Sequence, residues 1–307
     1  MLALLCAGQG TLSSDMFRLT EGHPAAAPVF AEASTLLGND PRELVRNGDD
    51  DHMRVNRTSQ ILVATAQLAL HACLADILPR EVAVAGYSVG EMAAWSIAGI
   101  WSPEDTLRLT DQRARAMDEA GGTNGQLAYV RGLDPVVVAA LAYSHHCAIS
   151  IINPGQLLVV GGDHDDIIAF CRTAEAAGAV RSAPIAVSIA SHTPRLSSAV
   201  TPFRQAMEAV PIAKPKPGYR LLAGGSGDCI FRPTSAVPEL AADVARTLDW
   251  DATLHALLEL GPKAVLDLGP GHALADMVRS MGKNIPSRST DDFNGIDGIV
   301  RWIYFHN

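Results

Sequence analysis

A serine flanked by two glycines stands in the stretch Gly86-Tyr87-Ser88-Val89-Gly90-Glu91, between the apolar run 82–85 and a helix-compatible segment at 92–100. This is the sequence form of a nucleophile elbow, in which a strand turns sharply into a helix and glycines remove the Cβ atoms that would block the bend. The unpaired N–H groups at the start of the helix favour negative charge near the serine oxygen. The stretch therefore indicates acyl chemistry at Ser88, with an ordinary strand-to-helix turn as the alternative.

A serine hydroxyl is a weak nucleophile and needs a base within hydrogen-bond reach, which is most often a histidine. The sequence contains ten histidines. The best placed is His192, because its segment, 188–194, follows a predicted strand. His272, which comes directly after a Gly-Pro-Gly turn, is the second candidate.

The composition is that of a globular protein, with 48% hydrophobic and 19% charged residues and no long low-complexity run. A chain of 307 residues has room for a large α/β domain that carries a smaller insert. The formal net charge of −9 argues against a general nucleic-acid binder, whose affinity depends on Lys and Arg.

The five cysteines are scattered and form no C-x-x-C pair, so we expect neither a disulfide framework nor a metal site. The most apolar segment, 61–78, is interrupted by Gln67, His71 and Asp76, which predicts a buried helix rather than a membrane span. The amino terminus lacks a basic region followed by a signal-type hydrophobic stretch. The expected location is therefore the cytoplasm, without a membrane partner.

The order of apolar runs and turn residues predicts two regions with different arrangements of strands and helices. In the first, apolar runs predict buried parallel strands, and periodic apolar positions predict helices: strands at 2–6, 82–85, 219–223 and 264–268, helices at 60–78, 103–117, 193–210 and 237–260. The second region has the β-α-β-β-α-β order of a ferredoxin-like unit: strand 127–131, helix 135–143, strands 148–152 and 157–161, helix 165–177, strand 181–187. We expect a discontinuous core of residues 1–124 and 189–307 and an inserted subdomain of residues 125–188.

Six motifs, in order and spacing, resemble those of the malonyl-CoA:acyl-carrier-protein transacylases, and the resemblance spans nearly the whole chain. They are Gly8-Gln9-Gly10, Gly86 to Glu91, Arg113 with Met117, Asn153-Pro154-Gly155-Gln156, Ser191-His192 and Leu268-Gly269-Pro270-Gly271. The resemblance implies an α/β-hydrolase-like core with a parallel sheet and a nucleophile elbow, plus an inserted ferredoxin-like α+β subdomain. It also implies an acyltransferase.

Carried over residue by residue, the resemblance implies that Ser88 is the acyl-accepting nucleophile and His192 its general base. The backbone N–H groups of Gln9 and Val89 would form the oxyanion hole, which agrees with the need for two fixed donors at the developing charge. A main-chain carbonyl, which we expect from Asp249-Trp250, would orient the histidine.

Arg113 would hold the free carboxylate of a malonyl group, for which a planar guanidinium offers two parallel hydrogen bonds. From the residues alone, an exposed arginine on a polar helix is the alternative. Gln60 and Asn153 match positions that line the pocket in this family. No metal or other cofactor is implied, because the CoA thioester is itself the substrate.

Two residues depart from the family pattern: Tyr87 replaces the usual histidine before the nucleophile, and Leu12 replaces a common glutamine. The elbow, the segment 187–193 and the tail 288–302 resemble instead the acyltransferase subunit of bacterial malonate decarboxylase. The function predicted first is malonyl transfer from malonyl-CoA to the phosphopantetheine-type thiol arm of a small carrier protein, through a malonyl-serine. The carrier would be that of malonate decarboxylase, whose other subunits would also be partners.

Three alternatives to that reading remain open. A general malonyl-CoA:acyl-carrier-protein transacylase of fatty-acid or polyketide synthesis would use the same residues. A serine hydrolase or thioesterase would share the elbow but has no need of Arg113, and it usually places an acidic residue between nucleophile and histidine in chain order. A non-catalytic carrier-binding module would have no reason to keep Ser88, His192 and Arg113.

Overall fold

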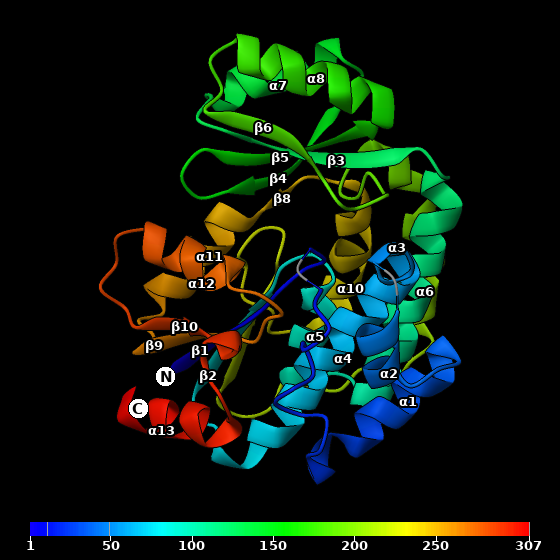
Figure 1. Cartoon of the computed structure of the whole chain (residues 1–307). Helices are drawn as coiled ribbons and strands as arrows, with labels where there is room; N and C mark the ends of the chain where they lie inside the picture. The colour runs from blue at the N-terminus through cyan, green and yellow to red at the C-terminus, as the bar shows by residue number, and fades with distance from the viewer. Residues whose placement is uncertain (11, 49, 307) are drawn as a thin grey trace.

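The computed structural model describes residues 1–10, 12–48 and 50–306. Its larger part is built on a five-stranded parallel sheet with the order β10-β9-β1-β2-β7 (Figure 1). The strands are β1 (Leu2–Cys6), β2 (Val82–Gly86), β7 (Tyr219–Leu222), β9 (Ala264–Asp267) and β10 (Ser287–Ser289). β1 and β2 are buried along their whole length, as expected of central strands covered on both faces. The predicted α/β fold with a parallel sheet is confirmed.

Helices surround this sheet. In chain order they are α1 (Ala27–Leu37), α2 (Pro41–Asn47), α3 (Asp50–Arg54), α4 (Asn56–Leu74), α5 (Gly90–Ile97), α6 (Pro103–Gly121), α9 (Val200–Glu208), α10 (Pro233–Ala242), α11 (Trp250–Glu259), α12 (Ala273–Ser280) and α13 (Ile296–His306). The apolar stretch Asn56–Ile77, which contains α4, is long enough to cross a membrane, but 67% of its most apolar window is buried inside the protein. It packs against α1, α5 and α6 as a core helix.

A second sheet, of order β6-β3-β5-β4-β8, lies across one end of the core (Figure 1). Its elements are β3 (Gly125–Arg131), α7 (Pro135–Ser144), β4 (Ala148–Asn153), β5 (Leu157–Asp163), α8 (His164–Ala176) and β6 (Arg181–Ile185). Helices α7 and α8 cover the outer face, and the other face is turned toward the core. The two-residue strand β8 (Leu248–Asp249), which comes from the core, pairs in parallel with β4.

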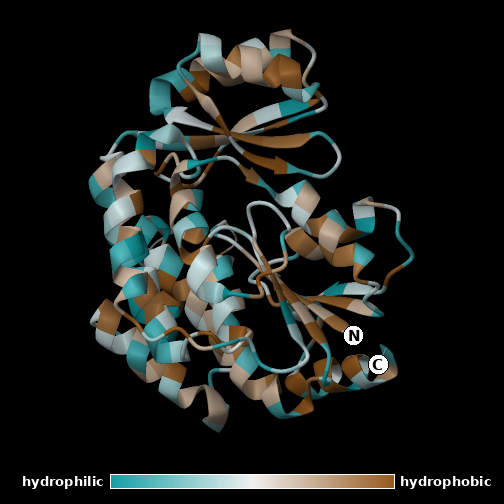
Figure 2. Cartoon of the chain, turned by 180° about the vertical axis from the view of Figure 1, so that it is seen from behind, coloured by the Kyte–Doolittle hydropathy of each residue, from teal (hydrophilic) through white to brown (hydrophobic). Residues whose placement is uncertain are grey.

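Apolar side chains form two separate clusters, one around the parallel sheet and one between the second sheet and its two helices. Figure 2 shows the matching pattern, with the hydrophobic residues gathered in the strands of both sheets. The second sheet therefore has a core of its own on its outer face, while Leu127, Ile151 and Val159 on its inner face belong to the cluster around the parallel sheet.

Two helices predicted from periodicity are broken in the structure. The range 193–210 divides into α9 and a preceding 3-10 helix, Pro194–Ala199, which is itself kinked at Leu196, where the backbone angles are non-helical. The range 237–260 leaves the helical path between α10 and α11, where a 3-10 turn, Asp243–Ala245, and strand β8 intervene. The side chain of Asp249 then starts α11 by accepting a hydrogen bond from the N–H of Ala252 at 2.9 Å.

Candidate active site

Ser88 lies at the turn from β2 into α5, with a left-handed backbone φ of 56°. The neighbouring glycines make this turn possible. A Cβ on Gly86 would stand 2.2 Å from the backbone nitrogen of Glu91, and one on Gly90 would stand 2.1 Å from the carbonyl oxygen of Cys6. A side chain at either position would push the turn away from the sheet, so the glycines fix Ser88 at the end of the strand.

The imidazole of His192 lies against the hydroxyl of this serine. Its Nε2 lies 2.7 Å from the Ser88 Oγ, and its Nδ1 lies 2.5 Å from the carbonyl oxygen of Asp243. The backbone N–H of His192 donates to the carbonyl of Val244 at 2.8 Å, which holds the residue at a left-handed φ of 59°. Nδ1–H therefore donates to a main-chain carbonyl and leaves Nε2 free to accept the serine proton.

The carbonyl that orients His192 belongs to Asp243, so the prediction of Asp249-Trp250 was wrong. The reason is the break between α10 and α11. Inside a continuous helix the carbonyl of residue 243 would accept an intrahelical hydrogen bond, whereas the 3-10 turn at the end of α10 directs it to the imidazole.

The imidazole of His192 is held in its neutral form. Burial lowers its pKa to about 3, and the positive charge of Arg113 acts in the same direction, against the hydrogen bond to the Asp243 carbonyl. A neutral imidazole is the form that accepts a proton from Ser88.

We therefore expect kcat/KM for acylation of Ser88 to show no inflexion near the ordinary histidine pKa of 6.5. Because the folded pKa is lowered, the base remains deprotonated as the pH falls, until the pH approaches about 3. Single-turnover acylation measured across the acidic range tests this. A loss of rate centred near 6.5 would show that the imidazole is not held neutral.

Arg113 reaches the same point from α6. Its side chain is 3% exposed, its Nη1 donates to the Oε1 of Gln60 at 2.6 Å, and its Nη2 lies 3.4 Å from the Ser88 Oγ. Burial lowers its pKa to about 10, so the guanidinium stays charged at neutral pH. The alternative of an exposed helical arginine is therefore wrong, and a guanidinium faces the hydroxyl of Ser88.

A chain of amides connects this arginine to the loop after β1. Gln60 donates through Nε2 to the Oδ1 of Asn56 at 2.8 Å, and Gln9 donates to the same oxygen at 3.1 Å. Asn56 in turn donates to the carboxylate of Asp118 at 2.8 Å. Asn56 was not predicted. The sign available in the sequence was its position four residues before Gln60, which places both side chains on one face of a helix.

The two N–H groups expected to form an oxyanion hole flank Ser88 on separate elements. Gln9 follows β1, and Val89 directly precedes α5. Neither N–H donates a hydrogen bond within the residues that the structure describes. Both are thus available for a ligand oxygen, as an oxyanion hole requires.

Ser88 opens into a cavity between the two sheets, lined by side chains of the core and of β3 to β6. A larger cavity of about 430 Å³ continues outward from it, and Tyr87 lines both. Asn153 lines the outer cavity, and its buried Oδ1 has no hydrogen-bond partner among the residues that the structure describes. At the rim, Arg131 and Arg181 stand directly opposite each other on β3 and β6. The path suits an extended ligand that reaches from the rim to Ser88.

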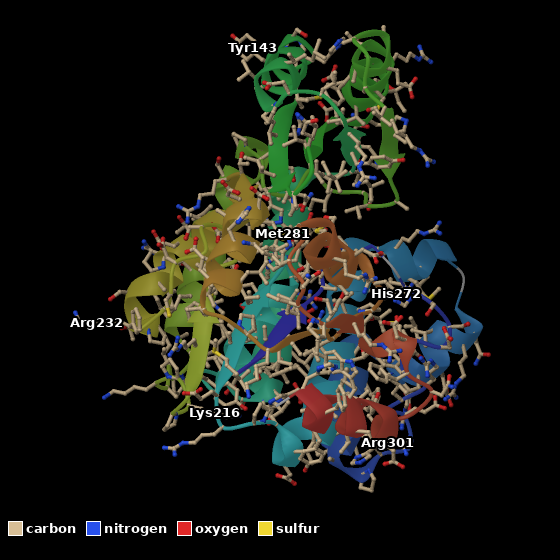
Figure 3. The ribbon with its side chains drawn as sticks, turned by 90° about the vertical axis from the view of Figure 1, so that its left-hand side faces the viewer. Tyr143, Lys216, Arg232, His272, Met281 and Arg301 are labelled. Carbon is tan, nitrogen blue, oxygen red and sulfur yellow. The ribbon has the colours of Figure 1, made fainter. Side chains whose placement is uncertain are left out.

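His272, the second candidate for the base, lies elsewhere. Its side chain is 48% exposed at the surface of the core (Figure 3), and its Nδ1 lies 3.1 Å from the carboxylate of Asp292. The structure therefore joins Ser88 to His192 and leaves His272 outside the site.

Comparison with known proteins identifies the family of this chain. The family model for the acyl transferase domain matches residues 4–288, which is most of the chain. The chain belongs to the acyl transferase family. It is therefore an enzyme that transfers acyl groups.

Relatives of this acyltransferase extend over its full length. The malonyl CoA-acyl carrier protein transacylase of Mycobacterium bovis is 27% identical over 306 residues, covering 98% of this chain and 99% of the relative. The acyl-carrier-protein S-malonyltransferase of Burkholderia pseudomallei 1710b superposes with a TM-score of 0.89 at 25% identity, covering 98% of this chain and 99% of that one. A malonyl-transacylase solved in complex with a type II polyketide acyl-carrier protein has the same fold, with a TM-score of 0.89 at 21% identity and 99% of each chain covered.

Proposed function

We propose that this acyltransferase moves a malonyl group from malonyl-CoA to the thiol of an acyl carrier protein, by way of a malonyl ester on Ser88. The observation that carries the proposal is the buried guanidinium of Arg113 beside the serine hydroxyl. An acyl chain that ends in a carboxylate would place its charge against this group, whereas a neutral acyl chain would leave a buried cation without a partner.

The first half of the proposed reaction forms the ester. His192 takes the proton of the Ser88 hydroxyl as the oxygen attacks the thioester carbonyl, and the N–H groups of Gln9 and Val89 stabilise the oxyanion. The carbon–sulfur bond then breaks, and the proton on His192 passes to the departing CoA thiolate. The malonyl-serine ester is held by its carboxylate on Arg113.

In the second half, the thiol of the carrier loses its proton to His192 and attacks the ester. The carbon–oxygen bond breaks, Ser88 regains the proton, and the malonyl thioester leaves on the carrier. The cycle consumes no metal, redox cofactor or water. The cavity between the two sheets supports it by limiting the access of water to the ester.

For the acceptor, we propose an acyl carrier protein of fatty-acid or polyketide synthesis, because the relatives bear the names of such transacylases. The carrier of malonate decarboxylase is the second candidate. The replacement of the usual histidine of the family by Tyr87, directly before Ser88, favours this second candidate.

The test is incubation with malonyl-CoA in the presence and absence of carrier, followed by measurement of free CoA, malonyl-carrier and malonate. We expect one equivalent of CoA without carrier, from a single acylation, and continuous turnover into malonyl-carrier when carrier is added. Continuous release of malonate without carrier would instead establish a hydrolase. Transfer rates to the two carrier types, measured side by side, decide between the acceptors.

A further inference from the structure

The carboxyl group of Glu91 lies beside the nucleophile but takes no part in the proposed cycle. Glu91 is in the first turn of α5 and is 2% exposed. Its N–H donates to the carbonyl of Ser88, and its Oε1 accepts the N–H of Gly224, both at 3.0 Å. No basic side chain of the described residues forms an ion pair with it. An acid is thus buried next to the nucleophile without a counter-ion in contact.

A second buried carboxyl group, that of Asp243, lies close to the first. A Cβ on Gly224 would stand 2.9 Å from the Oε2 of Glu91, and a Cβ on Gly225 would stand 2.9 Å from both carboxylate oxygens of Asp243. Two consecutive glycines therefore bring the backbone against both acids. Asp243 has a cation of its own, because Arg246 donates to it at 2.7 Å, and its carbonyl orients His192.

The charges around Glu91 favour its neutral form. Two buried carboxylates at close range do not readily ionise together. Burial also raises the pKa of Asp243, but Arg246 opposes this, and Glu91 has no such ion pair among the described residues. Burial and the charge of Asp243 raise the pKa of Glu91 to about 8, against the opposing influence of the Gly224 N–H and of Arg113. At neutral pH, Glu91 accordingly holds its proton while Arg113, whose pKa is about 10, holds its charge.

We propose that Glu91 is a positioning residue that acts in its protonated form, fixing Gly224 against the elbow as a neutral group and leaving the charge of Arg113 to the carboxylate of the substrate. Glu91 and Arg113 both contact Ser88, at its carbonyl and at its hydroxyl, and they influence each other electrostatically, so ionisation of Glu91 would place a competing negative charge near Arg113. The bound carboxylate would then be held less tightly, although it need not move. This inference rests on the proposed function, because it requires a substrate that carries a carboxylate.

The experiment measures KM and kcat for acylation by malonyl-CoA and by acetyl-CoA from about pH 7 to about pH 9, in the wild type and in Glu91→Gln. A glutamine keeps the oxygen that accepts the Gly224 N–H but cannot ionise. In the wild type we expect KM for malonyl-CoA to rise roughly fivefold to tenfold over this range, with acetyl-CoA nearly unaffected. In Glu91→Gln the rise disappears. Glu119→Gln, which changes an exposed glutamate on the helix of Arg113, is the matched control and should behave as the wild type.

The proposal is overturned if Glu91→Gln shows the same rise as the wild type, or if KM for acetyl-CoA rises in parallel with that for malonyl-CoA. The comparison of the two substrates needs only the wild type, so the test survives a variant that fails to fold. Failure of the proposed function gives a different result, since malonyl-CoA would then form no ester on Ser88 at any pH.

Discussion

Replacing Ser88 with alanine is expected to abolish the covalent acyl-enzyme and to lower the rate of transfer by about 10⁴-fold or more. The alanine methyl group cannot act as a nucleophile. The N–H groups of Gln9 and Val89 can then only polarise a bound thioester. Intact-protein mass spectrometry after brief exposure to malonyl-CoA measures the loss directly.

Ser191→Ala is the matched control for this result. Ser191 lines the same cavity, but it is the Ser88 oxygen that has the Nε2 of His192 as a partner at 2.7 Å. We expect the Ser191 variant to become labelled and the Ser88 variant to remain unlabelled. Persistent labelling of Ser88→Ala would place the nucleophile elsewhere.

The second large effect is expected at Arg113. Its replacement by alanine should lower kcat/KM for malonyl-CoA by about 10²- to 10³-fold, equivalent to roughly 3–4 kcal/mol, because a buried carboxylate would lose its charged hydrogen-bond partner. Acetyl-CoA has no carboxylate to lose, so its kcat/KM should change far less. The measurement is the ratio of the two values in the wild type and in the variant.

Arg113→Lys separates charge from geometry. A lysine keeps the positive charge but cannot offer two parallel N–H groups while also donating to Gln60 as Nη1 does at 2.6 Å. Its selectivity should therefore fall between that of the wild type and that of Arg113→Ala. An unchanged preference for malonyl-CoA in the alanine variant would contradict the proposed role.

The parts of the fold that were predictable are those in which local pattern and tertiary role agree. The apolar run before Gly86 had to be a buried strand, and the glycines after it had to be a turn, since the sheet leaves no room for side chains there. The strands and helices of residues 125–188 were visible for the same reason, because each apolar run ends at strong turn residues such as Asn153 to Gln156.

The interruption between α10 and α11 could not be predicted from the sequence. The apolar periodicity of Val237 to Leu260 continues across it, so nothing in that pattern marks a break. The break is decided by distant partners, His192 at the Asp243 carbonyl and β4 alongside β8. The one local sign was Asp249, an N-cap residue in the middle of the predicted helix.

The position of Arg113 was difficult to predict for a different reason. Its helix is polar enough to lie at a surface. Arg113 follows Leu109 and precedes Met117 by one turn each, on the buried face, but a long arginine side chain at such a place can still extend to solvent. The distinction comes from the packing of α6 against α4, which brings Gln60 to its guanidinium. Spacing within a family pattern could indicate this residue, whereas composition could not.

The pairing of β8 with β4 bears on how such enzymes can be recombined. The Thr247 hydroxyl donates to the carbonyl of Ile149 at 2.7 Å. The Ser150 hydroxyl donates to the carbonyl of Ser191, directly before His192, at 2.8 Å. A graft that exchanged residues 125–188 for those of a relative would therefore replace the surface against which the general base is aligned. Chimeras built to change acyl preference should take the 243–249 segment from the same parent as residues 125–188. The two segments that position His192 then come from one protein.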